Sequence, residues 1–505
     1  MEDFTFYFIL LFTTIILLSI LNKSRSRKSD GLPPSPPGLP IIGHLHLLGP
    51  LPHQSVHALS TRHGPIITLR FGSSPCIIAS SPESAREFLK THDADFASRP
   101  QSVAVHALSY GDSTFLFAKY GPYWRFMKKL CMSELLNGRM IDSFSPIRRE
   151  ERVSLVKSLL KKAESDEMVD MRGELIKLSY NVITRMMMSR RCTDTDGEAA
   201  DVREIVEETE KIAGMFNLQD FIWFCKGLDL QGLNKVMDHV HKRFDKIMEG
   251  VLKEKEEERR EGKGKERIKD LLDILLDVSD DVNAEVKLTR DNIKGFSMDI
   301  FTAGSDTSSV TTEWALAELI NHPSILSQAQ AEIDSVIGQT RLVEETDIPN
   351  LPYLQCIVKE TLRLHPAAPF IVREATKDCV VSGYKIPNKT RLIVNAWSVG
   401  RDPKYWDEPL EFNPDRFMET NNVGVETKGQ HFQLLPFGSG RRGCPGASLG
   451  SRVVHATLAS LVQCFDWKLD LVLDMQEGPG FTVPREKAFM CVPKARFNPF
   501  VTMGL

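Results

Sequence analysis

The sequence lacks the residue patterns that several common classes of protein require. Its 505 residues include nine cysteines, an odd number, and none of them form a C-x-x-C pair. Scattered cysteines argue against a disulfide framework and a zinc cluster, and they fit a reducing compartment. Positive charge is not in excess, because the formal net charge is −4. A nucleic-acid partner is therefore not expected, since phosphate binding depends mainly on lysine and arginine.

Glycine-rich phosphate loops after a strand, internal repeats and changes of composition are also missing. The chain is 42% hydrophobic and 26% charged, as in ordinary globular proteins. Length alone suggests about three domains, but the uniform pattern predicts one large, mainly α-helical body with a minor β part. Residues 66–71 and 76–80 are predicted to form a β-hairpin, and residues 82–91 a helix.

The N-terminus contains the one long uncharged apolar run, residues 4–21, with four basic residues between positions 23 and 28. Its length and the basic residues after it predict a retained transmembrane anchor with the body in the cytosol, in preference to a cleaved signal peptide. A proline-rich run follows, LPPSPPGLPIIG, which predicts a stiff spacer. The predicted segments are 1–22 (anchor), 23–43 (basic and proline-rich linker) and 44–505 (main body).

A single cysteine lies in an unusual loop, FGSGRRGCPG, Phe437 to Gly446. Four glycines in ten residues cost conformational entropy, so the loop needs a reason. A thiolate that binds a metal needs positive neighbours and backbone N–H groups directed at its sulfur. Gly440, Gly443 and Gly446 would let the backbone pass close to a flat cofactor, and Arg442 would reach an acidic group at its edge. An apolar helix follows Cys444, and its dipole also favours an anion there.

These residues match a known pattern. Phe437, Gly440, Arg442, Cys444 and Gly446 occupy every fixed position of F-x-x-G-x-R-x-C-x-G, so the loop resembles the haem-binding loop of the cytochrome P450 family. The resemblance implies the mainly α P450 fold, with 44–505 as one catalytic domain. It implies haem b (iron protoporphyrin IX) as cofactor, with Cys444 as the axial ligand of the iron.

A second match involves Glu360 and Arg363 in KETLR, three residues apart on one helical face. Alone, such a pair typically decorates a solvated surface. In the P450 family this pair joins a later arginine in a buried structural triad, and Arg416 in FNPDRF has the expected position. The resemblance therefore implies a triad that stabilises the core near the haem.

A third match is the segment Ile300 to Ile320, which resembles the long central helix of the family with its A-G-x-D-T-S signature. Small and hydroxylated residues weaken a helix and tend to bond its own carbonyls, so we expect a groove for dioxygen and water here. The resemblance implies that Thr307 orders water and that Asp306 relays protons. Without the cysteine loop, a polar interhelical contact would explain these residues equally well.

Residues that contact the haem propionates are also implied by resemblance. Trp124 and Lys128 occupy a Trp-x-x-x-Arg position in which this chain has lysine, and Arg125 lies beside them. Because lysine is a point charge and arginine a two-pronged donor, the contact from Lys128 is less specific. Arg373 resembles another propionate-binding arginine at the wall of the substrate pocket.

Across nearly its full length the chain looks like plant microsomal members of the family that include flavone synthase II, 2-hydroxyisoflavanone synthase, pterocarpan 6a-hydroxylase and a β-amyrin 24-hydroxylase. This likeness implies hydroxylation or desaturation of a flavonoid or isoflavonoid, or alternatively oxidation of a triterpenoid. Val372 replaces a lysine that assists aryl migration in isoflavone-forming enzymes, so that rearrangement is not expected. The expected pocket wall consists of Val103, Phe115, Phe216, Phe221, Ala303, Phe370, Ile371, Val372 and Phe481.

The same likeness implies dioxygen as a substrate, electrons from an NADPH–cytochrome P450 reductase, and a location in the endoplasmic reticulum membrane. Two rival functions remain at this point. A haem-thiolate isomerase or dehydratase would need neither dioxygen nor reductase, but such relatives commonly lose the helix threonine, which this chain keeps as Thr307. A haem sensor or carrier would have no need for Asp306 and Thr307.

Overall fold

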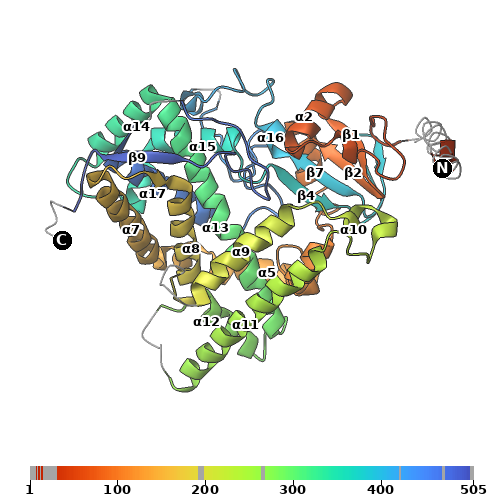
Figure 1. Ribbon diagram of the computed structural model, residues 1–505, viewed down its shortest axis with the longest axis horizontal. Coiled ribbons are helices and arrows are strands. Elements are labelled where there is room, and N and C mark those ends of the chain that lie inside the picture. The colour runs from red at the N-terminus through yellow and green to blue at the C-terminus, as the bar shows by residue number, and fades with distance from the viewer. Residues whose placement is uncertain are drawn as a thin grey trace.

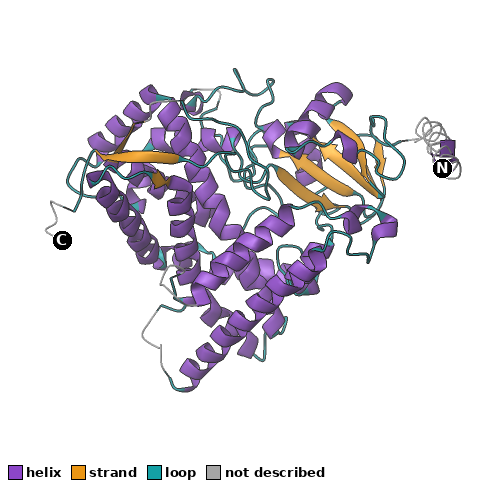
Figure 2. Cartoon of the chain, in the orientation of Figure 1, coloured by secondary structure: helices purple, strands orange, loops and turns teal. Residues whose placement is uncertain are grey.

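The computed structural model describes residues 31–191, 198–262, 268–419, 422–468 and 472–500, together with Tyr7, Leu10, Leu11, Thr13 and Thr14. Helices form most of the molecule, and the strands gather in two places on opposite sides of it (Figure 2). The predicted fold class, mainly α with a minor β part, is confirmed.

The helices differ widely in length, and the longest is α13. In chain order they are α2 (Pro52–His63), α3 (Pro82–Arg86), α4 (Val103–Leu108), α5 (Pro122–Leu130), α6 (Gly138–Ser143), α7 (Ser145–Glu164), α8 (Met171–Met188), α9 (Glu198–Gly214), α10 (Leu218–Phe221), α11 (Leu233–Arg260), α12 (Leu271–Asp280), α13 (Arg290–Asn321), α14 (Pro323–Val336), α15 (Pro352–Leu364), α16 (Ala396–Val399) and α17 (Ala447–Cys464). The predicted helix 82–91 is divided, because α3 passes into a π-helical turn, Glu87–Thr91.

The strands form three sheets, of order β1-β2-β7-β4, β3-β9-β8 and β5-β6. Their bounds are β1 (Ile66–Phe71), β2 (Ser74–Ala79), β3 (Val169–Asp170), β4 (Phe370–Glu374), β5 (Cys379–Val381), β6 (Tyr384–Ile386), β7 (Arg391–Asn395), β8 (Phe465–Lys468) and β9 (Met490–Ala495). The predicted hairpin is confirmed, with Ile66 opposite Ala79. Its turn is tighter than expected, because Gly72 has a φ of 57° and supplies the positive φ that two-residue hairpin turns need.

Helix α13 runs through the middle of the helical part (Figure 1) and contacts α8, α9, α12, α14, α15 and α17. Its residues 308–319 are buried, as expected for a helix packed on several sides. Gly304 permits the closest of these contacts, since a Cβ there would lie 2.7 Å from Cδ1 of Ile183 in α8. Helix α13 is continuous from Arg290 to Asn321, and the groove for dioxygen and water stays a prediction.

The predicted localisation needs a correction. Most of the predicted anchor, residues 4–21, lies outside the described residues. Among the helices that the structure describes, none is both long enough and apolar enough to cross a bilayer. This finding contradicts the prediction of a single-pass protein of the endoplasmic reticulum membrane, which is withdrawn.

One buried ionic group ties α15 to the chain that precedes the cysteine loop. Glu360 accepts two hydrogen bonds of 2.7 Å from Arg363 and one of 2.9 Å from Nε of Arg416. Arg363 also donates to the carbonyl oxygens of Gly400 and Pro409, each at 2.7 Å. The Glu360 and Arg363 side chains have no exposed surface. This ionic group therefore fixes the chain between Gly400 and Arg416, which has little regular secondary structure of its own.

Replacing Glu360 by glutamine tests the importance of this group for stability. The change leaves two buried guanidinium groups without their counter-charge, so the free energy of unfolding should fall by about 3–5 kcal/mol. Urea unfolding followed by circular dichroism measures it. Lys404→Gln, which breaks the exposed pair with Glu83, is the control and should change little. Equal effects of the two substitutions would contradict the structural role.

Candidate functional site

The loop that carries Cys444 turns back on itself just before α17. The N–H of Cys444 donates to the carbonyl of Phe437 at 2.9 Å, and the N–H of Gly443 donates to the carbonyl of Gly440 at 3.0 Å. Gly440 has a φ of 70°. A Cβ on Gly440 would lie 2.6 Å from the carbonyl oxygen of Leu89. This glycine is therefore required for packing against the turn Glu87–Thr91, a different reason from the approach to a cofactor that the sequence suggested.

The environment of the Cys444 sulfur is unfavourable for a lone thiolate. Burial raises the pKa of Cys444, although the N–H groups of Gly446 and Ala447 and the charges of Lys128 and Arg99 act in the opposite direction. Donors and cations directed at the sulfur stabilise an anion, while desolvation opposes it. A metal ion that binds the sulfur resolves this conflict, because it replaces the proton with a positive charge.

Both this loop and the central helix border a space inside the protein. Cys444 retains exposed surface although protein atoms desolvate its sulfur. On α13, Ala303 is exposed and Thr307 half-buried, whereas the following turns of the helix are buried. The first turn of α17 packs on the same helix, since a Cβ on Gly450 would lie 3.7 Å from Oγ of Ser308. The cysteine loop and Thr307 are therefore brought to the same region of the core.

Three arginines form a cationic cluster next to this region, of which Arg373 and Arg442 are buried and Arg99 is half-buried. Arg373 donates to the carbonyl of Arg442 at 3.1 Å. Burial, Arg99 and Arg442 hold the pKa of Arg373 well below its usual range, and burial together with Arg99 lowers the pKa of Arg442 to about 9. Nε of Arg99 and one terminal nitrogen of Arg442 are buried without a hydrogen-bond partner among the described residues. The cluster therefore fits an anionic ligand that carries several acceptor oxygens.

The predicted propionate-binding residues differ in how close they lie to this cluster. The ring of Trp124 is buried under the Arg442 guanidinium, 4.2 Å from its centroid. Lys128 donates to the carbonyl of Gly443 at 3.0 Å. Arg125 is exposed and lies over Tyr120, so the structure does not bring it to the cluster. Arg99 was missed by the sequence analysis, because nothing in Ser-Arg-Pro distinguishes it from a surface arginine.

On α13 the hydroxyl groups bond the helix itself. Thr307 donates to the carbonyl of Ala303 at 2.9 Å, and Ser305 donates to that of Phe301 at 2.7 Å. Asp306 accepts a hydrogen bond from the hydroxyl of Thr482, and burial raises the pKa of Asp306. Thr307 and Asp306 are therefore adjacent in sequence but differ in their surroundings. Thr307 faces the internal space, whereas Asp306 makes a buried polar contact with Thr482.

A second carboxylate of α13, Asp299, anchors the loop before α5. The Thr114 hydroxyl donates to both of its oxygens at 2.6 Å, and the N–H groups of Phe115 and Leu116 donate at 2.7 and 2.8 Å. Burial raises the pKa of Asp299 to about 6, against these hydrogen bonds and the charge of Arg99. The sequence analysis missed Asp299, although an acidic residue seven positions before Asp306 was the available signal.

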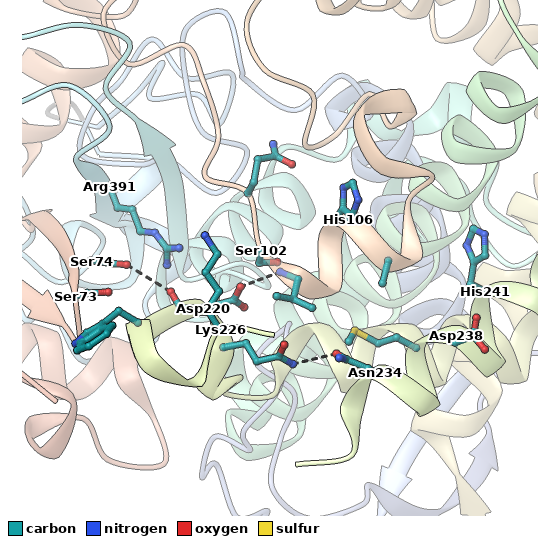
Figure 3. A pocket seen from close by; sticks show the side chains of 16 residues that line it. Ser73, Ser74, Ser102, His106, Asp220, Lys226, Asn234, Asp238, His241 and Arg391 are labelled. Atoms are coloured by element: carbon teal, nitrogen blue, oxygen red, sulfur yellow. Dashed lines mark hydrogen bonds between the residues drawn. The ribbon is translucent and has the colours of Figure 1, made fainter. Parts of the chain in front are cut away.

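A cavity of about 770 Å³ opens between α4, α10, α11 and the edge of the β1-β2-β7-β4 sheet. Figure 3 shows its polar wall, in which Asp220 accepts a hydrogen bond of 2.8 Å from the N–H of Val103. The wall is formed by Ser73, Ser74, Gln101, Ser102, Val103, His106, Ala107, Gln219, Asp220, Trp223, Lys226, Asn234, Met237, Asp238, His241 and Arg391. Of the nine predicted pocket residues, Val103 lines this cavity.

The other predicted pocket residues lie in several places. Phe216 and Phe221 stack on each other at 4.9 Å, at the end of α9 and in α10. Phe115 is buried and stacks on Trp124 at 6.1 Å. Phe370, Ile371 and Val372 belong to β4, where Ile371 is buried, and Ala303 and Phe481 are exposed. The structure therefore spreads these residues over several elements, and the apolar wall that the sequence suggested is not the wall of the large cavity.

Comparison with known proteins assigns the family. The family profile described as "Cytochrome P450" matches residues 33–492. The chain belongs to the cytochrome P450 family. It is accordingly a haem-thiolate monooxygenase, an oxidoreductase that incorporates oxygen, with haem b as cofactor and Cys444 as the axial ligand. The desolvated sulfur and the buried cations described above fit this group.

Individual relatives cover almost the whole chain. The 3,9-dihydroxypterocarpan 6A-monooxygenase of Glycine max is 51% identical over 504 residues, 98% of this chain and 99% of that protein. The β-amyrin 24-hydroxylase of Glycine max is 44% identical, over 98% of each chain. A zebra fish cytochrome P450 structure with progesterone is 26% identical, with a TM-score of 0.75, and covers 88% of this chain and 100% of that chain.

Substitution of Asp299 by alanine tests how the loop before α5 is held. Removing the carboxylate leaves the Thr114 hydroxyl and two backbone N–H groups without their acceptor, at a cost of about 1–3 kcal/mol for each group that stays buried. Hydrogen exchange of residues 114–116 should therefore become faster. Asp291→Ala, an exposed acidic residue in the first turn of the same helix, should leave that exchange unchanged. Unchanged exchange in both variants would contradict the anchoring role.

Proposed function

We propose that this monooxygenase oxidises a hydroxylated flavonoid or isoflavonoid skeleton, of the pterocarpan kind. One observation that supports the proposal is the polar wall of the cavity between α4, α10 and α11, which includes Val103 of the predicted pocket but not Cys444, Ala303 or Thr307. A phenolic skeleton offers hydroxyl groups to such a wall, and flat rings to Trp223 and the imidazoles of His106 and His241. The name of the 51% identical relative, a pterocarpan monooxygenase, supports the same substrate class.

A triterpenoid is the second candidate, since a β-amyrin 24-hydroxylase is among the relatives. Its skeleton is almost entirely apolar, so it would leave most of the cavity's hydrogen-bonding groups without partners. The identity to that relative is also lower, 44% against 51%. The flavonoid class is therefore preferred.

The residues that hold the cofactor follow from the buried charges. Arg99, Arg373 and Arg442 are assigned to the propionate groups, because each is desolvated and because Arg373 and Arg442 are also repelled by Arg99. Trp124 supports Arg442 by lying against its guanidinium. Lys128 is assigned to the cysteine loop, where it contacts Gly443 and lowers the pKa of the Cys444 thiol by its charge. Phe437 and Gly446 shape that loop.

Haem supplies the activation of dioxygen and the one-electron chemistry when it is bound. The chain itself must move protons to that site and keep bulk water away. Thr307 is assigned to hold a water or a substrate oxygen, since its hydroxyl borders the internal space and can exchange the Ala303 carbonyl for another partner. Asp306 is assigned to carry protons, because burial raises its pKa toward the range in which a carboxyl group both gains and loses a proton.

The electron donor is proposed to be an NADPH–cytochrome P450 reductase. Exposed basic residues lie on and beside the elements that support the cysteine loop, namely Arg125 and Lys129 of α5, Arg139 of α6, and Arg441. Such a face attracts an acidic partner by long-range electrostatics. Lowering of the electron-transfer rate by salt would agree with this contact.

Turnover of the reconstituted enzyme tests the function. With reductase and NADPH, pterocarpans, flavanones and a β-amyrin substrate should be compared, and oxygen should be consumed with product only for the phenolic class. Thr307→Ala should release several times more hydrogen peroxide per NADPH, because protons arrive less reliably. Thr312→Ala loses a similar hydroxyl-to-carbonyl bond one helical turn further on and should stay coupled. Product from the triterpenoid alone would reject the substrate class, and unchanged coupling in Thr307→Ala would reject its role.

A further inference from the structure

Helix α9 presents one line of residues from the solvent toward Asp306. Glu207, Glu210 and Gly214 lie three and four residues apart and therefore share a face. Glu207 is exposed and Glu210 is half-buried. Gly214 lies against residues 480 and 481, since a Cβ on Gly214 would lie 3.0 Å from the backbone nitrogen of Phe481. The next residue, Thr482, donates its hydroxyl to Asp306. The face thus leads from water to the buried carboxyl group of α13.

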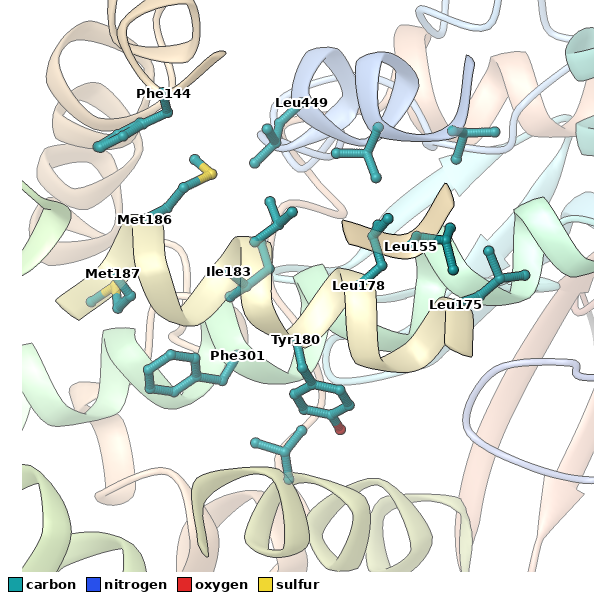
Figure 4. Close-up of a cluster of buried hydrophobic side chains, with 14 of the residues drawn as sticks. Phe144, Leu155, Leu175, Leu178, Tyr180, Ile183, Met186, Met187, Phe301 and Leu449 are labelled. Atoms are coloured by element: carbon teal, nitrogen blue, oxygen red, sulfur yellow. The ribbon is translucent and has the colours of Figure 1, made fainter. Parts of the chain in front are cut away.

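The middle residue of this face has an unmet hydrogen-bonding requirement. Oε1 of Glu210 is buried and has no hydrogen-bond partner among the residues that the structure describes. The hydroxyl of Tyr180 in α8, whose residue is 1% exposed, also has no partner within the described chain. Figure 4 shows Tyr180 on the side of α8 opposite Leu178 and Ile183, the side on which Phe301 also lies. A buried polar group without a partner needs an explanation, and a place in a polar path that includes water is one.

The charged groups near Glu210 lie on α9 itself and on the elements that pack around it. Asp306 of α13 and Glu207 of α9 act on it, while Tyr180 of α8 feels both Glu210 and Asp306. Arg172 of α8 acts on Asp306. From α11, Arg243 pairs with Glu204 and Glu208, and the titratable side chain of α4, His106, faces the cavity of Figure 3. Glu210 therefore has two carboxyl groups as electrostatic neighbours and no cation as an ion-pair partner in the described chain.

We propose that Glu210 is a proton-relay residue that resupplies Asp306 from solvent through Glu207. Its protonated carboxyl group gives a proton to an intervening water, which passes one to the Asp306 carboxylate, so that each O–H bond that breaks is matched by one that forms. The Glu210 carboxylate then regains a proton from water at Glu207, and no electrons move. Glu210 acts through Asp306, and it therefore supports the reaction without touching substrate or haem.

The chemistry of Glu210 suits this position. Burial, followed by the negative charges of Asp306 and Glu207, raises the pKa of Glu210 to about 9. The group is therefore protonated at neutral pH, whereas an exposed glutamate would already have lost its proton. The inference rests on the proposed function, because a relay to Asp306 matters only if Asp306 carries protons.

Glu210→Gln tests the relay, because it keeps the shape of the side chain and removes the exchangeable carboxyl proton. Peroxide released per NADPH should rise several-fold with a pterocarpan substrate, and the solvent isotope effect on product formation should increase. Glu210→Asp should restore part of the coupling, since it restores the acid. Glu208→Gln, on the neighbouring face, is the matched control and should behave as wild type. Wild-type coupling and isotope effect in Glu210→Gln would overturn the proposal.

Thermal unfolding gives a readout that does not depend on turnover. A carboxyl group with a pKa of about 9 in the folded state and about 4.3 when unfolded binds an extra proton in the folded protein between these values. Its contribution to stability is complete below the unfolded pKa and is lost as the pH rises toward 9. The Tm of wild type should therefore fall relative to that of Glu210→Gln between pH 6 and 9. Parallel Tm curves would overturn the assignment of Glu210 as the buried acid.

If Glu210→Gln does not fold, the pH dependence of peroxide release in the wild type tests the relay instead. Peroxide per NADPH should stay constant near neutral pH and rise as the pH passes about 9, where Glu210 loses its proton. A flat ratio from pH 7 to 10 would overturn the relay. Failure of the proposed function is distinguishable, because it would appear as a wild type that forms no product from any phenolic substrate.

Discussion

Desolvation of charge is the physical constraint on which the site depends. The Cys444 sulfur is surrounded by protein that disfavours a thiolate, while three arginines beside it are buried where their positive charges repel one another. Neither group is stable alone in a medium of low polarity. A planar cofactor with a metal at its centre and carboxylates at its edge supplies the opposite charge to both the sulfur and the arginines. Binding of haem therefore removes the electrostatic cost of burying these groups.

The surrounding fold holds the cysteine loop and the groups around it in position. The Glu360, Arg363 and Arg416 group fixes the irregular chain that leads to the cysteine loop, and the positive φ of Gly440 lets that loop pack against Leu89. On the other side, α13 places three kinds of group along one helix. Asp299 holds the loop before α5, Thr307 borders the internal space, and Asp306 meets the chain around Thr482. A single helix therefore positions all three groups.

Local sequence was sufficient for features that depend on a few neighbouring residues. The β-hairpin at 66–79 followed from alternating apolar residues around a glycine turn, and the fixed positions of the cysteine loop led to the family and its cofactor. Features that depend on tertiary contact were not predictable from local pattern, and the Glu360, Arg363 and Arg416 triad was expected only through the family resemblance. Arg99 and Asp299 acquire their importance only from distant partners, and Arg125 turns outward. The polar wall of the large cavity was not predictable either, because it joins segments far apart in sequence.

The most direct test of the central claim is the absorption spectrum of the reduced, carbon monoxide-bound protein. If Cys444 binds iron as a thiolate, the Soret band should show the strong red shift of thiolate-ligated haem, and Cys444→Ser should abolish that shift while the protein keeps its circular dichroism. A wild-type band in the position found for imidazole-ligated haem, or a Cys444→Ser variant with an unchanged red-shifted band, would contradict the account.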